Sequence, residues 1–174
     1  MTAPTLTPIP YDTFLADIAA LAAAVRADAS WQPQFLVGIG RGGLVPCTYL
    51  SHATGVPMLS IDGSSGVAAF ADDLIDLLAA RTRDGDALLF VDDINDTGGT
   101  IERARAALAR SGATGDRVRF AVLIDNVRSA ARVDYRARAI DRAVTKDWFV
   151  FPWEAVAPTA AIVDDAQAVP ERTA

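Results

Sequence analysis

The sequence predicts a single α/β domain over residues 1–174, with a mostly parallel central sheet and helices on both of its faces. Its length of 174 residues is enough for one hydrophobic core and short for two ordinary ones. A composition of 51% hydrophobic and 22% charged residues is typical of a folded globular chain and excludes wholesale disorder. Short apolar runs alternate with stretches of helical periodicity, which favours parallel strands connected by helices.

In the first half of the chain, the pattern predicts two strands and two helices. The apolar runs 35–39 and 56–61 are short and bounded by glycine or polar residues, as expected of strands buried on both faces. A helix is expected between them, from about Leu44 to just before Gly55. A second, amphipathic helix is expected from apolar residues that recur at helical spacing, namely Phe70, Leu74, Leu77 and Leu78.

In the second half, the apolar runs 87–91, 118–124 and 148–151 predict three further strands. The helix between the first two of these runs is marked by Ile101, Ala104 and Leu108 and is closed by Gly112. Residues 1–10 and about 156–174 have weak patterning, so we expect them to be flexible or peripheral.

The charge balance and the rare residue types exclude several classes of function. There are 16 basic and 22 acidic residues, so nucleic acid is not an expected partner of this acidic chain. One cysteine, Cys47, and one histidine, His52, allow neither an internal disulfide nor a zinc site. No apolar run reaches the ~20 residues that span a bilayer, and no signal peptide is recognisable. We therefore expect a cytoplasmic protein without a membrane partner.

Residues 88–100 carry the strongest chemical signal. An apolar run leads into two adjacent carboxylates, Asp92 and Asp93, and then into a turn that opens the next helix: Asp96, Thr97, Gly98, Gly99 and Thr100. Open α/β sheets bind ligands at the carboxyl ends of their strands. The free N–H groups of such a turn bind an anion, the threonine hydroxyls can donate to it, and the glycines let it approach the backbone. The segment therefore predicts a phosphate site beside two carboxylates.

Two carboxylates beside an anion site are compatible if the ligand supplies hydroxyl groups and a divalent cation. Hydroxyls donate to carboxylates, and Mg²⁺ prefers carboxylate oxygens and offsets their charge. A ribose phosphate with magnesium meets both conditions. On its own, an acidic pair at the end of a strand is equally compatible with a helix cap or a solvated turn.

A second glycine turn, Gly40-Arg41-Gly42-Gly43, follows the predicted strand at 35–39. Exposed N–H groups at a glycine turn and one guanidinium can together bind pyrophosphate, because Arg41 forms charge-assisted hydrogen bonds with phosphate oxygens. The alternative is a plain turn between a strand and a helix that carries a surface arginine.

These segments resemble the motifs of type I phosphoribosyltransferases, most closely those of the xanthine and hypoxanthine branch. Residues 88–100 are similar to the family's motif for phosphoribosyl pyrophosphate (PRPP), and the turn at 41–43 is similar to its pyrophosphate loop. A third segment, 147–154, is similar to the nucleobase end of xanthine phosphoribosyltransferases. The resemblance covers about residues 35–154 and implies the family's α/β fold, with a small hood region on the C-terminal side.

The resemblance implies that the protein joins a nucleobase to PRPP with release of pyrophosphate, with Mg²⁺ as cofactor. In this assignment, Asp92 and Asp93 hold the ribose hydroxyls and the magnesium. Asp96 is the general acid/base near the reacting ring nitrogen of the base. The 5′-phosphate is bound by backbone groups of 96–100.

The resemblance also implies roles for residues outside that motif. Arg41 and Gly42 bind pyrophosphate, and the bond between them is a candidate for the cis form that the family can show there. Trp148 and Phe149 bind the base, since stacking on a flat aromatic face contributes roughly 1–3 kcal/mol per base. Glu154 is a weaker candidate for a second magnesium contact.

Two features depart from the family pattern. The flexible loop that usually closes over PRPP has only the segment 60–66 as a counterpart, followed by an acidic helix, which leaves turnover open. Asp125 stands where the oxopurine enzymes place a lysine that contacts the exocyclic oxygen of the base. If it faces the base, its carboxylate favours an exocyclic amine over a carbonyl. Otherwise it is a turn residue beside Asn126.

Several alternatives remain open at this point. The same fold can serve a regulator that binds PRPP or nucleotides with little turnover, and an enzyme could use adenine or a pyrimidine. The arginines between 128 and 142 are expected to form a solvated face, with a dimer contact or a phosphate-facing edge as alternatives. The expected partners are PRPP, pyrophosphate, a nucleobase or its monophosphate, and further copies of the chain in a dimer or tetramer.

Overall fold

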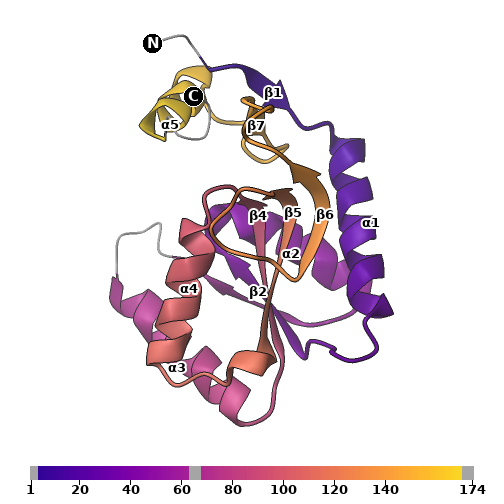
Figure 1. The fold of residues 1–174 in the computed structure, drawn as a ribbon, viewed down its shortest axis with the longest axis vertical. Helices are drawn as coiled ribbons and strands as arrows, with labels where there is room; N and C mark the ends of the chain where they lie inside the picture. Colours follow the sequence, from indigo (N-terminus) through magenta and orange to yellow (C-terminus); the bar gives the residue numbers. More distant parts are fainter. Residues whose placement is uncertain (1–3, 63–67, 170–174) are drawn as a thin grey trace.

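A five-stranded parallel sheet forms the centre of the molecule (Figure 1), with the strand order β3-β2-β4-β5-β6. The computed structural model describes residues 4–62 and 68–169, apart from the side chains of 68–71. The strands of the sheet are β2 Phe35–Ile39, β3 Met58–Ile61, β4 Leu88–Asn95, β5 Val118–Asn126 and β6 Tyr135–Ile140. The predicted α/β class with a mostly parallel sheet is confirmed.

Helices cover both faces of the sheet. Helices α1 (Tyr11–Ala27) and α2 (Gly40–Thr54) pack on one face, and α3 (Ala68–Arg83) and α4 (Gly99–Arg110) pack on the other. The alternation of side chains along a strand explains this division. In β4, Leu89 and Val91 belong to the cluster with α1 and α2, whereas Leu88 and Phe90 belong to the cluster with α3 and α4.

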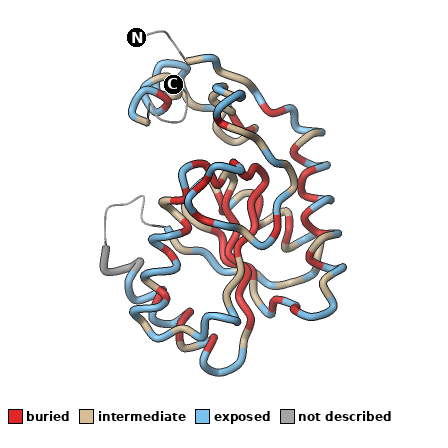
Figure 2. The backbone as a smooth tube through the Cα atoms, in the orientation of Figure 1, coloured by how far each residue is buried: buried red, intermediate tan, exposed pale blue. Residues whose placement is uncertain are grey.

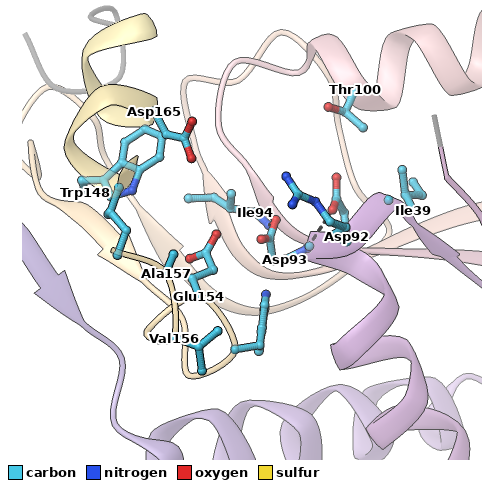
Figure 3. A pocket seen from close by; sticks show the side chains of 15 residues that line it. Ile39, Asp92, Asp93, Ile94, Thr100, Trp148, Glu154, Val156, Ala157 and Asp165 are labelled. Atoms are coloured by element: carbon cyan, nitrogen blue, oxygen red, sulfur yellow. Dashed lines mark hydrogen bonds between the residues drawn. The ribbon is translucent and has the colours of Figure 1, made fainter. Parts of the chain in front are cut away.

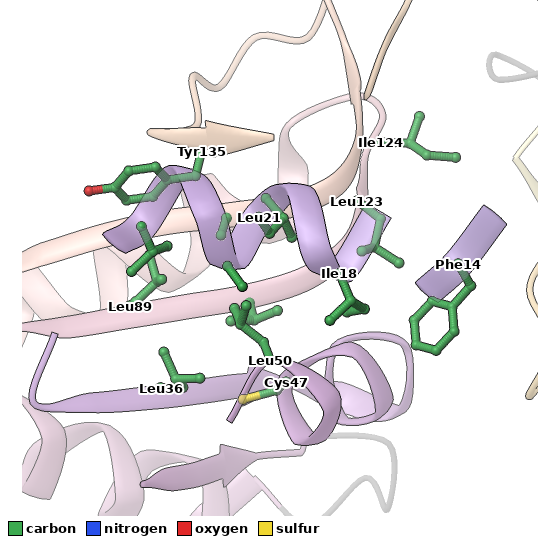
Figure 4. Packing of buried hydrophobic residues seen from close by; sticks show 14 of the residues in the cluster. Phe14, Ile18, Leu21, Leu36, Cys47, Leu50, Leu89, Leu123, Ile124 and Tyr135 are labelled. Carbon is green, nitrogen blue, oxygen red and sulfur yellow. The ribbon is translucent and has the colours of Figure 1, made fainter. Parts of the chain in front are cut away.

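The first of these clusters is the larger and joins three layers of structure (Figure 4). Phe14, Ile18 and Leu21 of α1 are each at most 4% exposed and pack over the sheet beside Cys47 of α2. Burial raises the pKa of the Cys47 thiol to about 12, so this cysteine is an inert core residue. Figure 2 shows the buried residues concentrated along the central strands and the inner side of α1.

Two element boundaries differ from the sequence-based expectations in a way that matters for the site. Helix α2 begins at Gly40, so the Arg-Gly-Gly turn forms the first turn of the helix and does not precede it. Strand β4 continues to Asn95, so Asp92 and Asp93 lie within the strand. The backbone pairing with β5 continues through this region, with Asp92 opposite Val122 and Asn95 opposite Asp125.

The chain termini contribute a small hood beyond the carboxyl ends of the sheet strands (Figure 1). Strand β1 (Leu6–Pro8) pairs in parallel with β7 (Trp148–Val150), and helix α5 (Thr159–Ala168) follows. A short 3-10 helix, Gly115–Arg117, connects α4 to β5. The segments 1–10 and 156–174, which were expected to be flexible or peripheral, contribute β1 and α5 to this hood. None of the helices in the described ranges has the length and apolar character needed to cross a membrane.

The remaining expectation about the fold concerns the loop after β3. Of the segment 60–66, Ser60, Ile61 and Asp62 belong to the described residues. The rest of this segment lies outside them.

Candidate active site

A cavity of about 530 Å³ opens between the carboxyl edge of the sheet and the hood (Figure 3). Four parts of the chain contribute most of its lining. The first turn of α2, the end of β4 and the first turn of α4 lie on the sheet side, and the segment from β7 to α5 lies on the hood side. The lining includes Ile39, Gly40, Arg41, Gly42, Asp92, Asp93, Ile94, Thr100, Trp148, Trp153, Glu154, Val156, Ala157, Ile162 and Asp165.

The α2 turn and the acidic pair are in direct contact. A Cβ placed on Gly42 would stand 2.5 Å from Asp93 Oδ2, and one placed on Gly43 would stand 2.1 Å from the carbonyl oxygen of Val91. Glycine at position 43 therefore lets α2 begin against the backbone of β4, and a larger residue at position 42 would have to displace the Asp93 side chain. Arg41 is exposed and lines the cavity beside Gly42. The peptide bond between them is trans, like the other peptide bonds of the described residues, so the structure does not have the cis form considered from the resemblance.

The segment from Asp96 to Thr100 forms a tight loop that runs into the N-terminus of α4. Gly98 has a φ of 97°, a left-handed conformation that favours glycine, and a Cβ there would stand 2.6 Å from the backbone nitrogen of Ala131. Residues 94–101 line a small hollow at this helix N-terminus, which is the geometry that binds an anion.

Arg103 adds a cation to this phosphate loop that the sequence analysis did not identify. Its Nη2 lies 3.3 Å from Thr100 Oγ1, and its Nη1 would stand 3.1 Å from a Cβ placed on Gly99. The side chain reaches back over the loop from one turn further along α4. The sequence contains one signal for this contact: Arg103 follows Thr100 by three residues, a spacing that places two side chains on the same side of a helix.

Behind the phosphate loop, a buried polar network holds it in place. Asn95 Nδ2 donates to Asp125 Oδ1 at 2.8 Å and to the carbonyl oxygen of Ala131 at 2.9 Å, and Asn95 Oδ1 accepts from Ser129 Oγ at 2.8 Å. The second oxygen of Asp125 accepts from Arg136 Nη1 at 2.9 Å. With both oxygens engaged and 5% of the residue exposed, Asp125 supports the loop from behind. The expectation that Asp125 contacts the base does not fit this placement.

Asp96, the first residue of the phosphate loop, also lines a smaller side cavity of about 100 Å³ together with residues of the hood. Its carboxylate forms a two-pronged ion pair with Arg142, with Nε 3.0 Å from Oδ1 and Nη2 2.7 Å from Oδ2. Both residues are buried, at 4% and 7% exposure. Arg142 was expected on a solvated face, and the structure corrects that expectation.

Three other arginines of the same stretch also have acidic partners. Arg128 pairs with Asp141, Arg136 with Asp125, and Arg138 with Asp17. The basic stretch is thus largely neutralised within the molecule, and β6 brings two of these arginines, Arg136 and Arg138, to aspartates elsewhere in the fold.

The hood supplies the aromatic side of the site. Trp148 lines both the main and the side cavity, and Phe149 lines the side cavity with the Arg142 guanidinium 5.4 Å from its ring centre. Trp153 packs on Phe151, with 4.8 Å between ring centres, and touches the cavity at its edge. Trp148 and Phe149 are therefore placed where a flat ligand could stack on or beside them.

Glu154 faces the acidic pair across the cavity (Figure 3). Its Oε2 accepts from the backbone nitrogen of Phe151 at 2.9 Å. Burial raises the pKa of Glu154, and the nearby Asp93 and Asp165 carboxylates raise it further, while Arg41 has the opposite effect. The site therefore favours a proton or another positive charge at this position.

The described residues contain no group of three or more metal-ligating side chains already arranged around a common point. Asp92, Asp93 and Glu154 nevertheless offer the carboxylate oxygens that Mg²⁺ prefers. Magnesium commonly binds through one or two carboxylates together with substrate phosphates and water. The donor set therefore fits a cation that arrives with a phosphorylated ligand.

Comparison with solved structures supports the same fold. The chain superposes on a purine phosphoribosyltransferase from Pyrococcus horikoshii with a TM-score of 0.62 at 24% identity, covering 86% of this chain and 94% of that one. A xanthine-guanine-hypoxanthine phosphoribosyltransferase from Helicobacter pylori gives 0.61 at 22% identity, covering 86% and 93%. A hypothetical protein from Neisseria gonorrhoeae with bound ppGpp gives 0.68 at 20% identity, covering 98% of both chains. At these identities the likeness establishes the fold.

The family is established by a different comparison. The family model for the phosphoribosyl transferase domain matches residues 10–157, which include the α2 turn, the acidic pair, the phosphate loop and the aromatic side of the hood. Because that match spans most of the sequence, the chain belongs to the phosphoribosyl transferase domain family.

Proposed function

We propose that this protein transfers the 5-phosphoribosyl group from PRPP to a purine base and releases pyrophosphate. The observation that carries the proposal is the composition of the cavity. One space is bordered by an arginine at a glycine turn, an acidic pair, the first turn of α4 with Thr100, and Trp148. These are the groups needed for pyrophosphate, ribose hydroxyls, a phosphate and a flat base, in that order.

The roles of the residues follow from their positions. The loop 96–100 would receive the 5′-phosphate, with Arg103 as an additional donor. Asp92 and Asp93 would accept hydrogen bonds from the ribose hydroxyls, and Arg41 with the Gly42 N–H would bind the pyrophosphate. A ligand held at these points spans the cavity with its reactive carbon facing the hood.

In the reaction, the bond from C1′ of the ribose to the pyrophosphate oxygen breaks, and the oxygen keeps the electron pair. A ring nitrogen of the base forms the new bond to C1′ and gives up its proton to Asp96. Asp92, Asp93 and Glu154 are the residues that would hold Mg²⁺, which when bound offsets charge on the departing pyrophosphate. Trp148 and Phe149 would orient the base.

A purine is favoured over a pyrimidine on two grounds. Trp148 and Phe149 provide a broad aromatic surface next to Asp96, and stacking strengthens with ring area. Two proteins of the same fold, from Pyrococcus horikoshii and Helicobacter pylori, are described as purine and xanthine-guanine-hypoxanthine phosphoribosyltransferases. One assay identifies the preferred purine and tests the proposed role of the protein in purine salvage.

That assay incubates the protein with PRPP, Mg²⁺ and each of adenine, guanine, hypoxanthine, xanthine, uracil and orotate, and measures released pyrophosphate. We expect release with at least one purine and a requirement for Mg²⁺. Release only with a pyrimidine would contradict the proposed base. Absence of release with every base would contradict the transferase function.

A second candidate function is regulation by nucleotide binding without turnover. It is favoured by one observation, the likeness over nearly the whole chain to the Neisseria gonorrhoeae protein with bound ppGpp. Calorimetry with ppGpp, GMP and PRPP separates the two. Tight binding of ppGpp together with no pyrophosphate release from any base would favour the regulator.

A further inference from the structure

Beyond its ion pair with Asp96, the Arg142 guanidinium holds the hood. Its Nη1 donates to the carbonyl oxygen of Asp147 at 2.7 Å and to that of Thr145 at 3.2 Å. These carbonyls immediately precede Trp148, the first residue of β7. The same planar group therefore binds a carboxylate on the sheet side with one edge and the backbone leading to the aromatic residues with another.

The backbones of the two partners are also tied together. Buried Asn126, at the end of β5, donates from Nδ2 to the carbonyl oxygen of Asp96 at 2.9 Å. Its Oδ1 accepts from the backbone nitrogen of Arg142 at 3.2 Å. One side-chain amide thus fixes the spacing of the two segments that the ion pair connects.

Stability alone is a poor explanation for this arrangement. Taking a guanidinium and a carboxylate out of water carries a desolvation cost that an apolar pair of the same volume would avoid. Five other Arg–Asp ion pairs of the described residues each contain an arginine whose side chain is at least 26% exposed; their acidic partners are Asp17, Asp28, Asp86, Asp125 and Asp141. The Arg142–Asp96 pair differs from these in its burial and in bordering the cavity beside Trp148.

We propose that Arg142 is a positioning residue that fixes the Asp96 carboxylate against the base and locks the hood to the sheet at the same point. This inference rests on the proposed phosphoribosyl transfer, in which Asp96 takes the proton of the base. Arg142 acts through Asp96, so the direction of its carboxylate and the position of Trp148 are set by one group. Arg142 thereby holds the proton acceptor, Asp96, and the base-stacking residue, Trp148, at fixed positions relative to each other.

Several charged groups share the two cavities that Asp96 borders. They are Asp93 of β4, Glu154 of the hood, Arg142, and Arg128 and Lys146 on the outer side of the loop. Arg142 is the partner that bonds directly to both carboxylate oxygens. Replacing it by a neutral residue therefore removes the group that sets the direction of this carboxylate.

The test is a double-mutant cycle of Arg142→Gln and Asp96→Asn, followed by steady-state kinetics with the preferred base. Arg142→Gln should lower kcat by about 100-fold, the scale of general acid–base catalysis, and change the KM for PRPP by less than about threefold. In the Asp96→Asn background, the same change should cost less than about threefold, because the two residues act as a unit.

Arg142→Lys keeps the positive charge but cannot form the paired hydrogen bonds of a guanidinium, and should recover part of the lost kcat. The matched control is Arg128→Gln, which breaks an Arg–Asp pair of the same region whose arginine side chain is 61% exposed, and it should leave kcat unchanged. Calorimetric affinity for magnesium-PRPP should be equal in wild type and Arg142→Gln, which shows that the variant is folded.

Two results would overturn the inference. Additive losses in the double variant would make Arg142 a structural anchor of the hood only, while wild-type turnover would leave the transferase function intact. No turnover by the wild type with any base would instead refute the transferase function and, with it, the role of Arg142.

Discussion

The Asp93 carboxylate lies directly against the α-carbon of Gly42, where a Cβ would come within 2.5 Å of Oδ2 and 2.8 Å of Cγ. This contact joins the first turn of α2 to the acidic pair of β4. The proposed pyrophosphate and ribose subsites are therefore adjacent, and the size of the residue at position 42 affects both.

Gly42→Ala should weaken binding of magnesium-PRPP by about tenfold or more, since displacing a packed group costs about 1–3 kcal/mol. The added methyl group must push the Asp93 side chain out of its position. Gly115→Ala is the matched control, because nothing lies within 4 Å of a Cβ there. Equal PRPP affinity in both variants, measured by calorimetry, would show that the contact is unimportant for the ligand.

Replacing Asp92 and Asp93 together by Ala should weaken magnesium-PRPP binding by well over tenfold, because hydrogen bonds to charged groups contribute about 1.5–3 kcal/mol each. The control is the same change at Asp72 and Asp73, another adjacent pair, which is exposed on α3. The fold should persist in both, as judged by circular dichroism. Unchanged affinity in the first variant would remove the acidic pair from the site.

Arg41→Ala should impair binding of pyrophosphate and PRPP by roughly one to two decades, the value of one charge-assisted contact. A nucleoside monophosphate has no pyrophosphate at C1′, so its affinity should stay nearly constant. Arg117→Ala removes an exposed charge from the 3-10 helix and serves as the control. If Arg41→Ala weakens all three ligands equally, the side chain has a general role in folding.

Asp125→Asn should lower the free energy of unfolding by about 1–3 kcal/mol and leave the ranking of bases unchanged. The reason is that the amide cannot accept from both Asn95 and Arg136, the two donors that the carboxylate satisfies. Urea unfolding gives the first quantity, and kcat/KM for four purines gives the second. A change in the preferred purine would instead place Asp125 in the base site.

Glu154→Gln should become more stable relative to the wild type as the pH rises. Because the pKa of Glu154 is raised in the folded protein, folding favours its protonated form. The wild type therefore loses stability as the pH rises through that raised pKa, whereas the glutamine variant does not titrate there. Unfolding midpoints measured between about pH 4 and pH 8 should diverge over that range. A constant difference would show that Glu154 is not perturbed.

Most features of the site that could be anticipated from the sequence are local ones. The acidic pair and the loop 96–100 lie within one strand–turn–helix unit, so their spacing along the chain nearly determines their arrangement. The Arg-Gly-Gly turn is similarly local. Its close approach to Asp93 depends on β2 and β4 being neighbours in the sheet. The alternating pattern predicts a parallel sheet but does not give the order of its strands.

Features that depend on partners distant in sequence could not be anticipated. Arg142 and Asp96 are 46 positions apart. In the sequence, Arg142 is only one of several arginines in a basic stretch. Asp125 was placed correctly at the end of a strand, but its side-chain direction depends on strand pairing with Asn95. Helix α1 is different, because its buried residues recur at helical spacing, and that signal was available in the sequence: Phe14, Ile18, Leu21, Ala22 and Val25.

The pairing of β1 with β7 makes the start of the chain part of the wall that carries Trp148. Leu6 lies opposite Trp148 and Thr7 opposite Phe149, and Thr7 Oγ1 donates to Asp147 Oδ2 at 2.8 Å. A purification tag or a fusion partner joined at this end is therefore attached to the wall of the proposed base site, and we expect it to alter binding of the base.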